Sequence, residues 1–326
     1  MEAIAALNDS HGQKIPSILP STFKTFAPLL LANKDAIKSI SSTQDIAYGP
    51  HPRQKLDLYP SSTNPSTAPI LIFLHGGGFI RGDKLSPQVP ESLVYANVGA
   101  FFATHGFTTI CMNYRLVNAG ENWNVGEGAK FPSGGEDVAA ALSWVEGEFG
   151  GKGEKREVFL LGSSAGGVHA STFVFGKEFE AHRKELVSGQ RGVVLKGLIN
   201  VAVPVHFKKA EPARGEVLKA YYGEPKEMEE KSVFGLLEAI KESGKKREEV
   251  AVPKCLAMLG EFDPVDEIGE PMEDFVNLWK ATFGDGIEFL KMEGHNHISP
   301  PLSLMSGDKK GEKWGEDLVS WVKKQV

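Results

Sequence analysis

The sequence has few cysteines and no surplus of positive charge. Its 326 residues include only two cysteines, Cys111 and Cys255, and each lies in an apolar run. Two such thiols do not make a disulfide framework, so we expect both to be buried and reduced. The 42 acidic residues exceed the 36 basic ones, which gives a formal net charge of -6. Because no basic stripe is present to neutralise a phosphate backbone, a nucleic-acid partner is not expected.

Long apolar runs and metal-binding motifs are also missing. We find no stretch of about 18 apolar residues, so no membrane span is expected. Residues 1–16 lack both the basic start and the continuous apolar segment of a signal peptide, so we do not expect one. Together with the unpaired cysteines, this favours a cytoplasmic protein. The histidines and cysteines lack Cys-x-x-Cys or His-Glu-x-x-His spacing, so neither a metal nor another cofactor is expected. The sequence leaves the oligomeric state open.

Short apolar runs that alternate with helical patterns are what the sequence does contain. Five strong runs and one weaker run occupy residues 69–74, 108–116, 157–164, 195–203, 254–262 and 287–294. Such runs are typical of strands buried on both faces, and the helices between them predict parallel crossovers. We therefore expect one α/β domain over residues 1–326, with a mostly parallel central sheet flanked by helices. Helix-rich segments at about 1–43 and 205–250 interrupt the alternation and are expected to form a helical cap.

The first motif with chemical meaning is GSSAG, residues 162–166. It follows the apolar run at 157–161 and precedes a helical pattern, which is the strand–turn–helix context of a nucleophile elbow. Small residues at positions 162 and 166 let so tight a turn form without clashes. Ser164 is therefore the candidate nucleophile, and the N–H group of Ala165 is a candidate oxyanion donor at the start of a helix.

The second motif is HGGGF, residues 75–79, which comes directly after the apolar run at 69–74. Consecutive glycines cost backbone entropy, which indicates that bare N–H groups must approach another group closely. Acyl transfer needs such donors for the tetrahedral oxyanion. Gly77 and Gly78 are the candidates. A phosphate loop is a poor alternative, since no Lys-Ser or Lys-Thr follows.

The acid and the base are expected at the ends of later strands. Asp263 follows the run at 254–262, and two histidines, His295 and His297, follow the last run. A chain order of Ser, Asp and His is typical of α/β-hydrolases. We favour Asp263 over Asp266, which lies beyond a proline and suits a turn or helix cap. We favour His297 over His295, which suits a loop or a supporting position.

Taken together, HGGGF, NYRL, FPSGGEDVAAALSWV and GSSAGG resemble the hormone-sensitive-lipase-like carboxylesterase branch of the α/β-hydrolases. The similarity covers roughly residues 45–326. It implies that Gly77, Gly78 and Ala165 form the oxyanion hole and that Asp263 is the first aspartate of the family's D-P-x-x-D pattern. Two departures stand out. Asn113 occupies the first position of the family's D-Y-R-L-A-P-E, and His297-Ile-Ser replaces H-G-F, a pattern more similar to arylformamidase-type hydrolases.

These observations predict a serine hydrolase that cleaves a carboxylic ester of a small molecule through an acyl-enzyme on Ser164. Asp263 and His297 would complete the catalytic triad. An amidase or arylformamidase, a lactone hydrolase and an acyltransferase would share this machinery, and a non-catalytic binding homologue is the remaining alternative. The acyl pocket is expected between the sheet and the cap. Its candidate lining residues are Phe26, Trp123, Phe207 and Tyr222.

Overall fold

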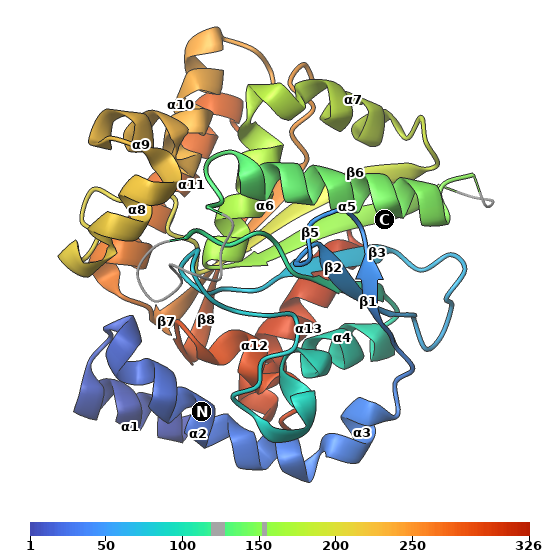
Figure 1. Ribbon diagram of the computed structural model, residues 1–326, viewed down its shortest axis with the longest axis vertical. Helices are drawn as coiled ribbons and strands as arrows, with labels where there is room; N and C mark the ends of the chain where they lie inside the picture. The colour runs from blue at the N-terminus through green and yellow to red at the C-terminus, as the bar shows by residue number, and fades with distance from the viewer. Residues whose placement is uncertain (119–127, 152–154) are drawn as a thin grey trace.

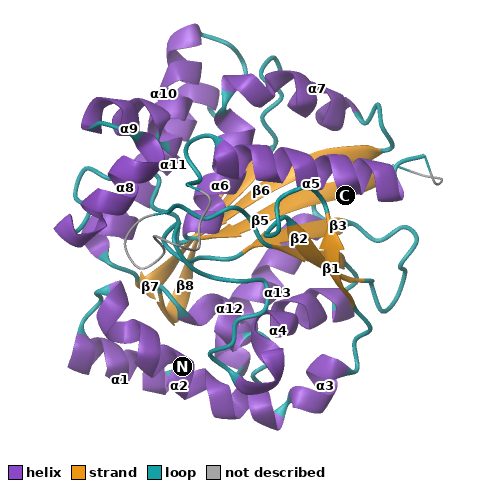
Figure 2. Cartoon of the chain, viewed as in Figure 1, coloured by secondary structure: helices purple, strands orange, loops and turns teal. Residues whose placement is uncertain are grey.

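A central sheet of eight strands lies between layers of helices in the computed structural model, which describes residues 1–118, 128–151 and 155–326 (Figures 1 and 2). The strands are β1 (Thr43–Ala47), β2 (Lys55–Tyr59), β3 (Ile70–Leu74), β4 (Thr108–Met112), β5 (Arg156–Ser163), β6 (Val193–Val201), β7 (Lys254–Phe262) and β8 (Ile287–Asn296). Their order across the sheet is β1-β2-β4-β3-β5-β6-β7-β8. β2 runs antiparallel to both neighbours, and the other adjacent pairs are parallel. The expected mostly parallel sheet is therefore confirmed.

Burial along the strands explains the apolar runs. Every residue of β3 and β4 is buried, since helices cover both faces of the sheet at its centre. β8 is an edge strand and exposes several side chains, which accounts for its weaker apolar pattern. Cys111 in β4 and Cys255 in β7 are both buried and unpaired, as expected.

The flanking helices divide between the two faces of the sheet (Figure 1). One face carries α4 (Leu93–Thr104), α12 (Ser299–Ser303) and α13 (Lys309–Lys323). The opposite face carries α5 (Ser133–Phe149), α6 (Ala165–Phe175), α7 (Glu180–Ser188) and α11 (Glu270–Phe283). Short helical turns lie at Pro90–Ser92, Lys177–Phe179, Pro212–Arg214 and Val265–Gly269. This arrangement leaves the carboxyl ends of the parallel strands open to the loops that carry the candidate site.

Two further groups of helices come from the segments expected to form a cap. The N-terminal group is α1 (Glu2–His11), α2 (Ile15–Ala32) and α3 (Lys34–Lys38), and it packs against α4, α12 and β8. The second group is α8 (Gly215–Tyr222), α9 (Pro225–Lys231) and α10 (Val233–Ser243). The predicted helical content of both segments is confirmed, whereas their role as a cap stays a prediction.

The N-terminal helix α2 qualifies the expectation about apolar stretches. Among the described residues it is the one helix of 18 residues that is long and apolar enough to cross a bilayer. Length and composition alone do not show a span, because the core helix of a soluble protein passes the same test. In this structure one face of α2, which carries Ile18, Thr22, Phe26 and Leu30, is buried against protein.

Candidate active site

Ser164 occupies a strained turn between β5 and α6. Its backbone has φ 51° and ψ −122°, and its N–H donates to Val201 O at 2.9 Å. A Cβ on Gly162 would lie 2.3 Å from Gly167 Cα, and one on Gly166 would lie 2.2 Å from Leu74 O. Only glycine fits these two positions, which is why the elbow requires the GSSAG pattern. The Ser164 side chain remains partly exposed.

A continuous line of hydrogen bonds joins the three residues expected to form the triad. His297 Nε2 lies 3.0 Å from Ser164 Oγ, and His297 Nδ1 lies 2.8 Å from Asp263 Oδ1. A carboxylate only accepts, so Nδ1–H is the donor to Asp263 in the neutral ring. Nε2 is then free to accept the proton of the Ser164 hydroxyl.

Asp263 is itself fixed in place. Its second oxygen, Oδ2, accepts the N–H of Gly260 at 2.6 Å. Asp263 is 4 % exposed and His297 is 5 % exposed, so water hardly competes for the bond between them. The charged and polar atoms of this pair are therefore satisfied inside the protein rather than by solvent.

The two residues weighed as alternatives, Asp266 and His295, have other partners. Asp266 is largely exposed and pairs with Lys209 at 3.1 Å. His295 is buried, with Nδ1 2.9 Å from Ser299 Oγ and Nε2 3.1 Å from Gly311 O. Burial lowers the pKa of His295 to about 4, so the ring is neutral at physiological pH. The structure therefore brings Asp263 and His297 to Ser164, and it gives Asp266 and His295 other partners.

The glycine loop, residues 75–82, packs directly against the nucleophile. A Cβ on Gly76 would lie 3.3 Å from Ser164 Cβ. Gly77 has φ 146°, and a Cβ there would lie 1.9 Å from Arg81 O, whereas Gly78 has φ 60° and open space around its Cβ position. Within the described residues, neither Gly77 nor Gly78 donates its N–H to a protein acceptor. Two backbone donors thus remain available in the loop that contacts Ser164 through Gly76.

Two side chains that follow β4, those of Asn113 and Tyr114, hydrogen-bond to the glycine loop. His75 Nε2 lies 3.1 Å from Asn113 Oδ1, and Asn113 Oδ1 also accepts the N–H of Lys84 at 2.6 Å. Asn113 Nδ2 donates to Asp83 at 3.0 Å, and Tyr114 donates its hydroxyl to His75 O at 2.7 Å. Burial lowers the pKa of His75 to about 4, which keeps the ring uncharged beneath the loop.

This support was missed at the sequence level, where Asn113 was noted only as a departure from a family pattern. Asn113 follows β4 and His75 follows β3, and these two strands are parallel neighbours. Because parallel neighbours end at the same edge of a sheet, contact between the two residues could have been inferred from strand order. A second missed group, Thr22 and Asn296, joins α2 to the residue before His297.

The aromatic residues proposed for the acyl pocket separate into two places. Phe207 and Tyr222 surround Phe79, with ring centroids 6.3 Å and 6.1 Å from it. Phe26 belongs to a different apolar cluster, formed by the N-terminal helices with α4 and α12. Trp123 lies outside the described residues. Phe207 and Tyr222 therefore lie beside the glycine loop, and their contact with a substrate stays a prediction.

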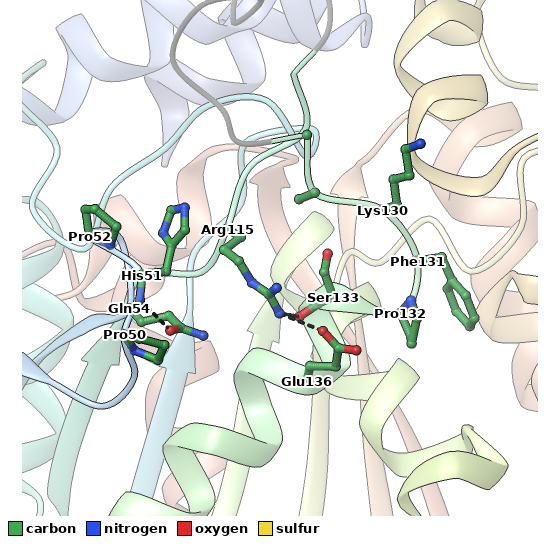
Figure 3. Close-up of a pocket in the computed structure, with 12 residues that line it drawn as sticks. Pro50, His51, Pro52, Gln54, Arg115, Lys130, Phe131, Pro132, Ser133 and Glu136 are labelled. Carbon is green, nitrogen blue, oxygen red and sulfur yellow. Dashed lines mark hydrogen bonds and ion pairs between the residues drawn. The ribbon is translucent and has the colours of Figure 1, made fainter.

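A cavity of about 570 Å³ lies beside the N-terminal end of α5 (Figure 3). Arg115 crosses it, donating to Ser133 O at 3.0 Å and to Glu136 Oε2 at 2.8 Å. The described lining residues are Pro50, His51, Pro52, Gln54, Arg115, Gly128, Ala129, Lys130, Phe131, Pro132, Ser133 and Glu136. None of them is a candidate triad or oxyanion residue. Among the described residues, no group of three or more His, Cys, Asp or Glu side chains could hold a metal ion.

A comparison of the whole chain with known families decides where it belongs. The family model BD-FAE matches residues 56–244, which is more than half of the chain and includes the glycine loop and Ser164. The chain belongs to the BD-FAE family. The BD-FAE match ends before Asp263 and His297, so the placement of these two residues rests on the structure.

Curated relatives of this BD-FAE member carry esterase names. Over 153 residues it is 28% identical to the probable isoprenylcysteine alpha-carbonyl methylesterase ICMEL2 of Arabidopsis thaliana, covering 44% of this chain and 31% of that protein. Over 157 residues it is 30% identical to the probable carboxylesterase 7 of the same plant, covering 45% of this chain and 46% of that protein. The chain thus spans less than half the length of these relatives.

Solved structures match the BD-FAE chain over nearly its full length. Esterase B from Lactobacillus Rhamnosis (HN001) superposes with a TM-score of 0.65 at 16% identity, covering 95% of each chain. A hyperthermophilic esterase from the archaeon Pyrobaculum calidifontis superposes with a TM-score of 0.56 at 15% identity, covering 93% of each chain. At such identities the likeness establishes the fold, which is the α/β-hydrolase fold expected from the sequence.

Proposed function

We propose that this protein is a serine esterase that hydrolyses a carboxylic ester of a small molecule. The observation that carries the proposal is the line of hydrogen bonds from Asp263 through His297 to Ser164. The family membership and the esterase names of the relatives support the same reaction class. We also propose that residues 1–43 and 205–250 cap the site and that the protein works in the cytoplasm.

The proposed reaction has two halves. In the first, Ser164 Oγ attacks the ester carbonyl while His297 Nε2 takes the hydroxyl proton, and Asp263 stabilises the imidazolium that forms. The N–H groups of Gly77, Gly78 and Ala165 donate to the oxyanion. The alcohol leaves with the proton from His297, so that Ser164 is acylated. In the second half, His297 activates water, which attacks the acyl-enzyme and releases the carboxylic acid.

Hydrolysis of p-nitrophenyl acetate and butyrate tests the proposal directly. The wild type should turn these esters over, and a phosphonate probe should label Ser164, as read by mass spectrometry of the peptide. Ser164→Ala should lose labelling and up to about 10⁶-fold in turnover. A folded wild type that neither hydrolyses the esters nor reacts with the probe would reject the proposal and leave a non-catalytic binding protein as the better description.

A substrate panel then separates the alternatives that share this machinery. Arylformamides, lactones and small esters should be compared with an S-prenylcysteine methyl ester, because the first relatives carry the name of a methylesterase for such groups. Turnover per active site should be highest for an ester. A higher kcat/KM for an arylformamide than for any ester would show that the protein is better described as an amidase.

A further inference from the structure

Asn296, the residue before His297, closes the loop that presents the base. Its side-chain oxygen accepts the N–H groups of Ile298 and Ser299, each at 3.0 Å. Its backbone N–H donates to Ser299 Oγ at 3.1 Å. These bonds fix the backbone on both sides of His297, and we call residues 296–299 the base loop.

The remaining group of the Asn296 side chain is held by the N-terminal part of the chain. Asn296 Nδ2 donates to Thr22 Oγ1 at 2.9 Å, across 274 residues of sequence. The Thr22 hydroxyl donates in turn to Ile18 O at 2.8 Å, so its oxygen is oriented to accept. Asn296 is 2 % exposed and Thr22 is 0 % exposed, which excludes water as a replacement partner.

Thr22 is out of place in the helix that carries it. The buried residues of α2 recur every four positions, and apart from Thr22 they are apolar: Ile18, Phe26 and Leu30. A buried polar pair gains little stability over an apolar pair of the same shape, because both partners must leave water. Such a pair does provide a defined geometry. Here it fixes the side chain of Asn296, which lies next to His297 in the sequence.

We propose that Thr22 and Asn296 are positioning residues for His297, so that α2 is part of the active machinery and not only its cover. This inference rests on the proposed esterase function. Without the Thr22 hydroxyl, Asn296 Nδ2 is left buried and unpaired, and the amide turns to find another acceptor. The restraint on residues 297–299 then loosens, and His297 Nε2 leaves its place beside Ser164 Oγ for part of the time.

The test compares three single substitutions on α2. Thr22→Val removes the hydroxyl and keeps the shape of the side chain, and Thr22→Ser keeps the hydroxyl. Thr25→Val is the matched control, because the Thr25 hydroxyl also donates to the carbonyl four residues earlier, at 2.9 Å, but its bond stays within α2. Turnover of p-nitrophenyl butyrate is measured per active site, counted by phosphonate labelling of Ser164.

We expect Thr22→Val to lower kcat about tenfold with KM changed by less than about twofold, because a displaced base slows chemistry rather than binding. Thr22→Ser should restore kcat, and Thr25→Val should match the wild type. If Thr22→Val does not fold, Thr22→Ala removes the same hydroxyl without adding a methyl group.

Several outcomes overturn the inference. An unchanged kcat in a folded Thr22→Val or Thr22→Ala protein shows that the bond does not position His297. An equal loss in Thr25→Val assigns the effect to helix stability, and a rise in KM alone assigns Thr22 to substrate binding. An inactive wild type rejects the proposed function and the positioning role with it, whereas an active wild type beside an equally active Thr22→Val rejects the positioning role alone.

Discussion

Two loops converge on Ser164, and they are supported in different ways. The glycine loop, residues 75–82, is held by Asn113 and Tyr114, which follow the neighbouring strand β4. The base loop, residues 296–299, is held on one side by Asp263, which follows β7, and on the other by Thr22 from α2. The support of the glycine loop thus comes from residues at the carboxyl end of a neighbouring strand. The support of the base loop depends in part on a helix, α2, that packs outside the sheet.

The contrast shows that the two halves of the site differ in how they depend on the rest of the fold. Neighbouring parallel strands fix their ends relative to each other through the hydrogen-bond ladder, so the glycine loop is placed once β3 and β4 pair. The outer side of the base loop is placed only when α2 has docked against α12 and has brought Thr22 to Asn296 at the end of β8. Substitutions at the two supports should therefore have different effects.

Asp263→Asn breaks the inner support of the base loop and should have the largest effect. An amide at this position can donate to His297 Nδ1 and select the wrong ring tautomer, which costs about 10⁴-fold in kcat in comparable triads. Asp266→Asn is the control, because its carboxylate pairs with Lys209 at the surface. Ester turnover of the two purified variants is the measurement, and comparable losses would show that Asp263 has no special role.

Gly77→Ala breaks the glycine loop at its tightest point. The added Cβ would lie 1.9 Å from Arg81 O, a group of the same loop, so the loop must change its shape and its N–H groups must shift. Loss of one oxyanion donor costs about 10²–10³ in kcat. Gly78→Ala meets open space and should cost less, since only the positive φ is strained. The kcat values and melting temperatures of both variants test this, and an equal loss would contradict the role of the close approach.

Asn113→Leu removes the side chain that joins the glycine loop to β4. Its loss leaves the N–H of Lys84 without its acceptor inside the protein, together with a nitrogen of the His75 ring. We expect the free energy of unfolding to fall by about 2–3 kcal/mol, with a smaller loss of kcat per active site. Urea unfolding gives the first quantity. Asn64 is exposed, and the control variant Asn64→Leu should change neither the free energy of unfolding nor kcat. If Asn113→Leu also changes neither, Asn113 does not support the glycine loop.

The last prediction concerns stability alone, because two buried histidines near the site, His75 in the glycine loop and His295 in β8, make it depend on pH. Burial lowers the pKa of His75 and of His295 to about 4, well below the value of about 6.5 for an unfolded chain. Between these values the unfolded state binds the extra proton, so stability is complete above pH ~6.5 and falls as the pH drops toward 4. Each ring contributes at most about 1.4 kcal/mol per pH unit.

Urea unfolding at pH 7.5, 6 and 5 measures this slope. His295→Gln should flatten it by up to one proton, and substitution of the exposed His11 by Gln should leave it unchanged. An identical slope in the wild type and in His295→Gln would show that the pKa of His295 is the same in the folded and unfolded states, so that its ring is not buried in solution.

Much of the site followed from where polar residues stand relative to strands. Asp263 and His297 were predicted because each follows an apolar run, and the glycine loop because its glycines follow another. The choice of Asp263 over Asp266 followed from the proline between them, and the structure gives Asp266 an exposed partner instead. The structure brings these residues together because a parallel sheet collects the carboxyl ends of its strands on one side, and their catalytic roles stay predictions.

The supports that were missed depend on contacts that no local pattern encodes. Thr22 stands in an apolar stripe at helical spacing, and a single threonine there is easily taken for part of the core. Its partner Asn296 lies 274 residues away, and only the docking of α2 brings the two together. Asn113 was closer to prediction, because the order of β3 and β4 would have sufficed.

The helix behind the nucleophile leads to one further expectation. Every residue of α6 from Ala165 to Phe175 is buried, whereas α2 exposes much of its surface to water. Amide hydrogens of α6 should therefore exchange with deuterium only when the entire fold opens, and those of α2 should exchange through a cheaper local opening. A low urea concentration that detaches α2 should then abolish ester hydrolysis while the sheet and α6 around Ser164 remain folded. Loss of activity should therefore precede unfolding of the sheet as the urea concentration rises.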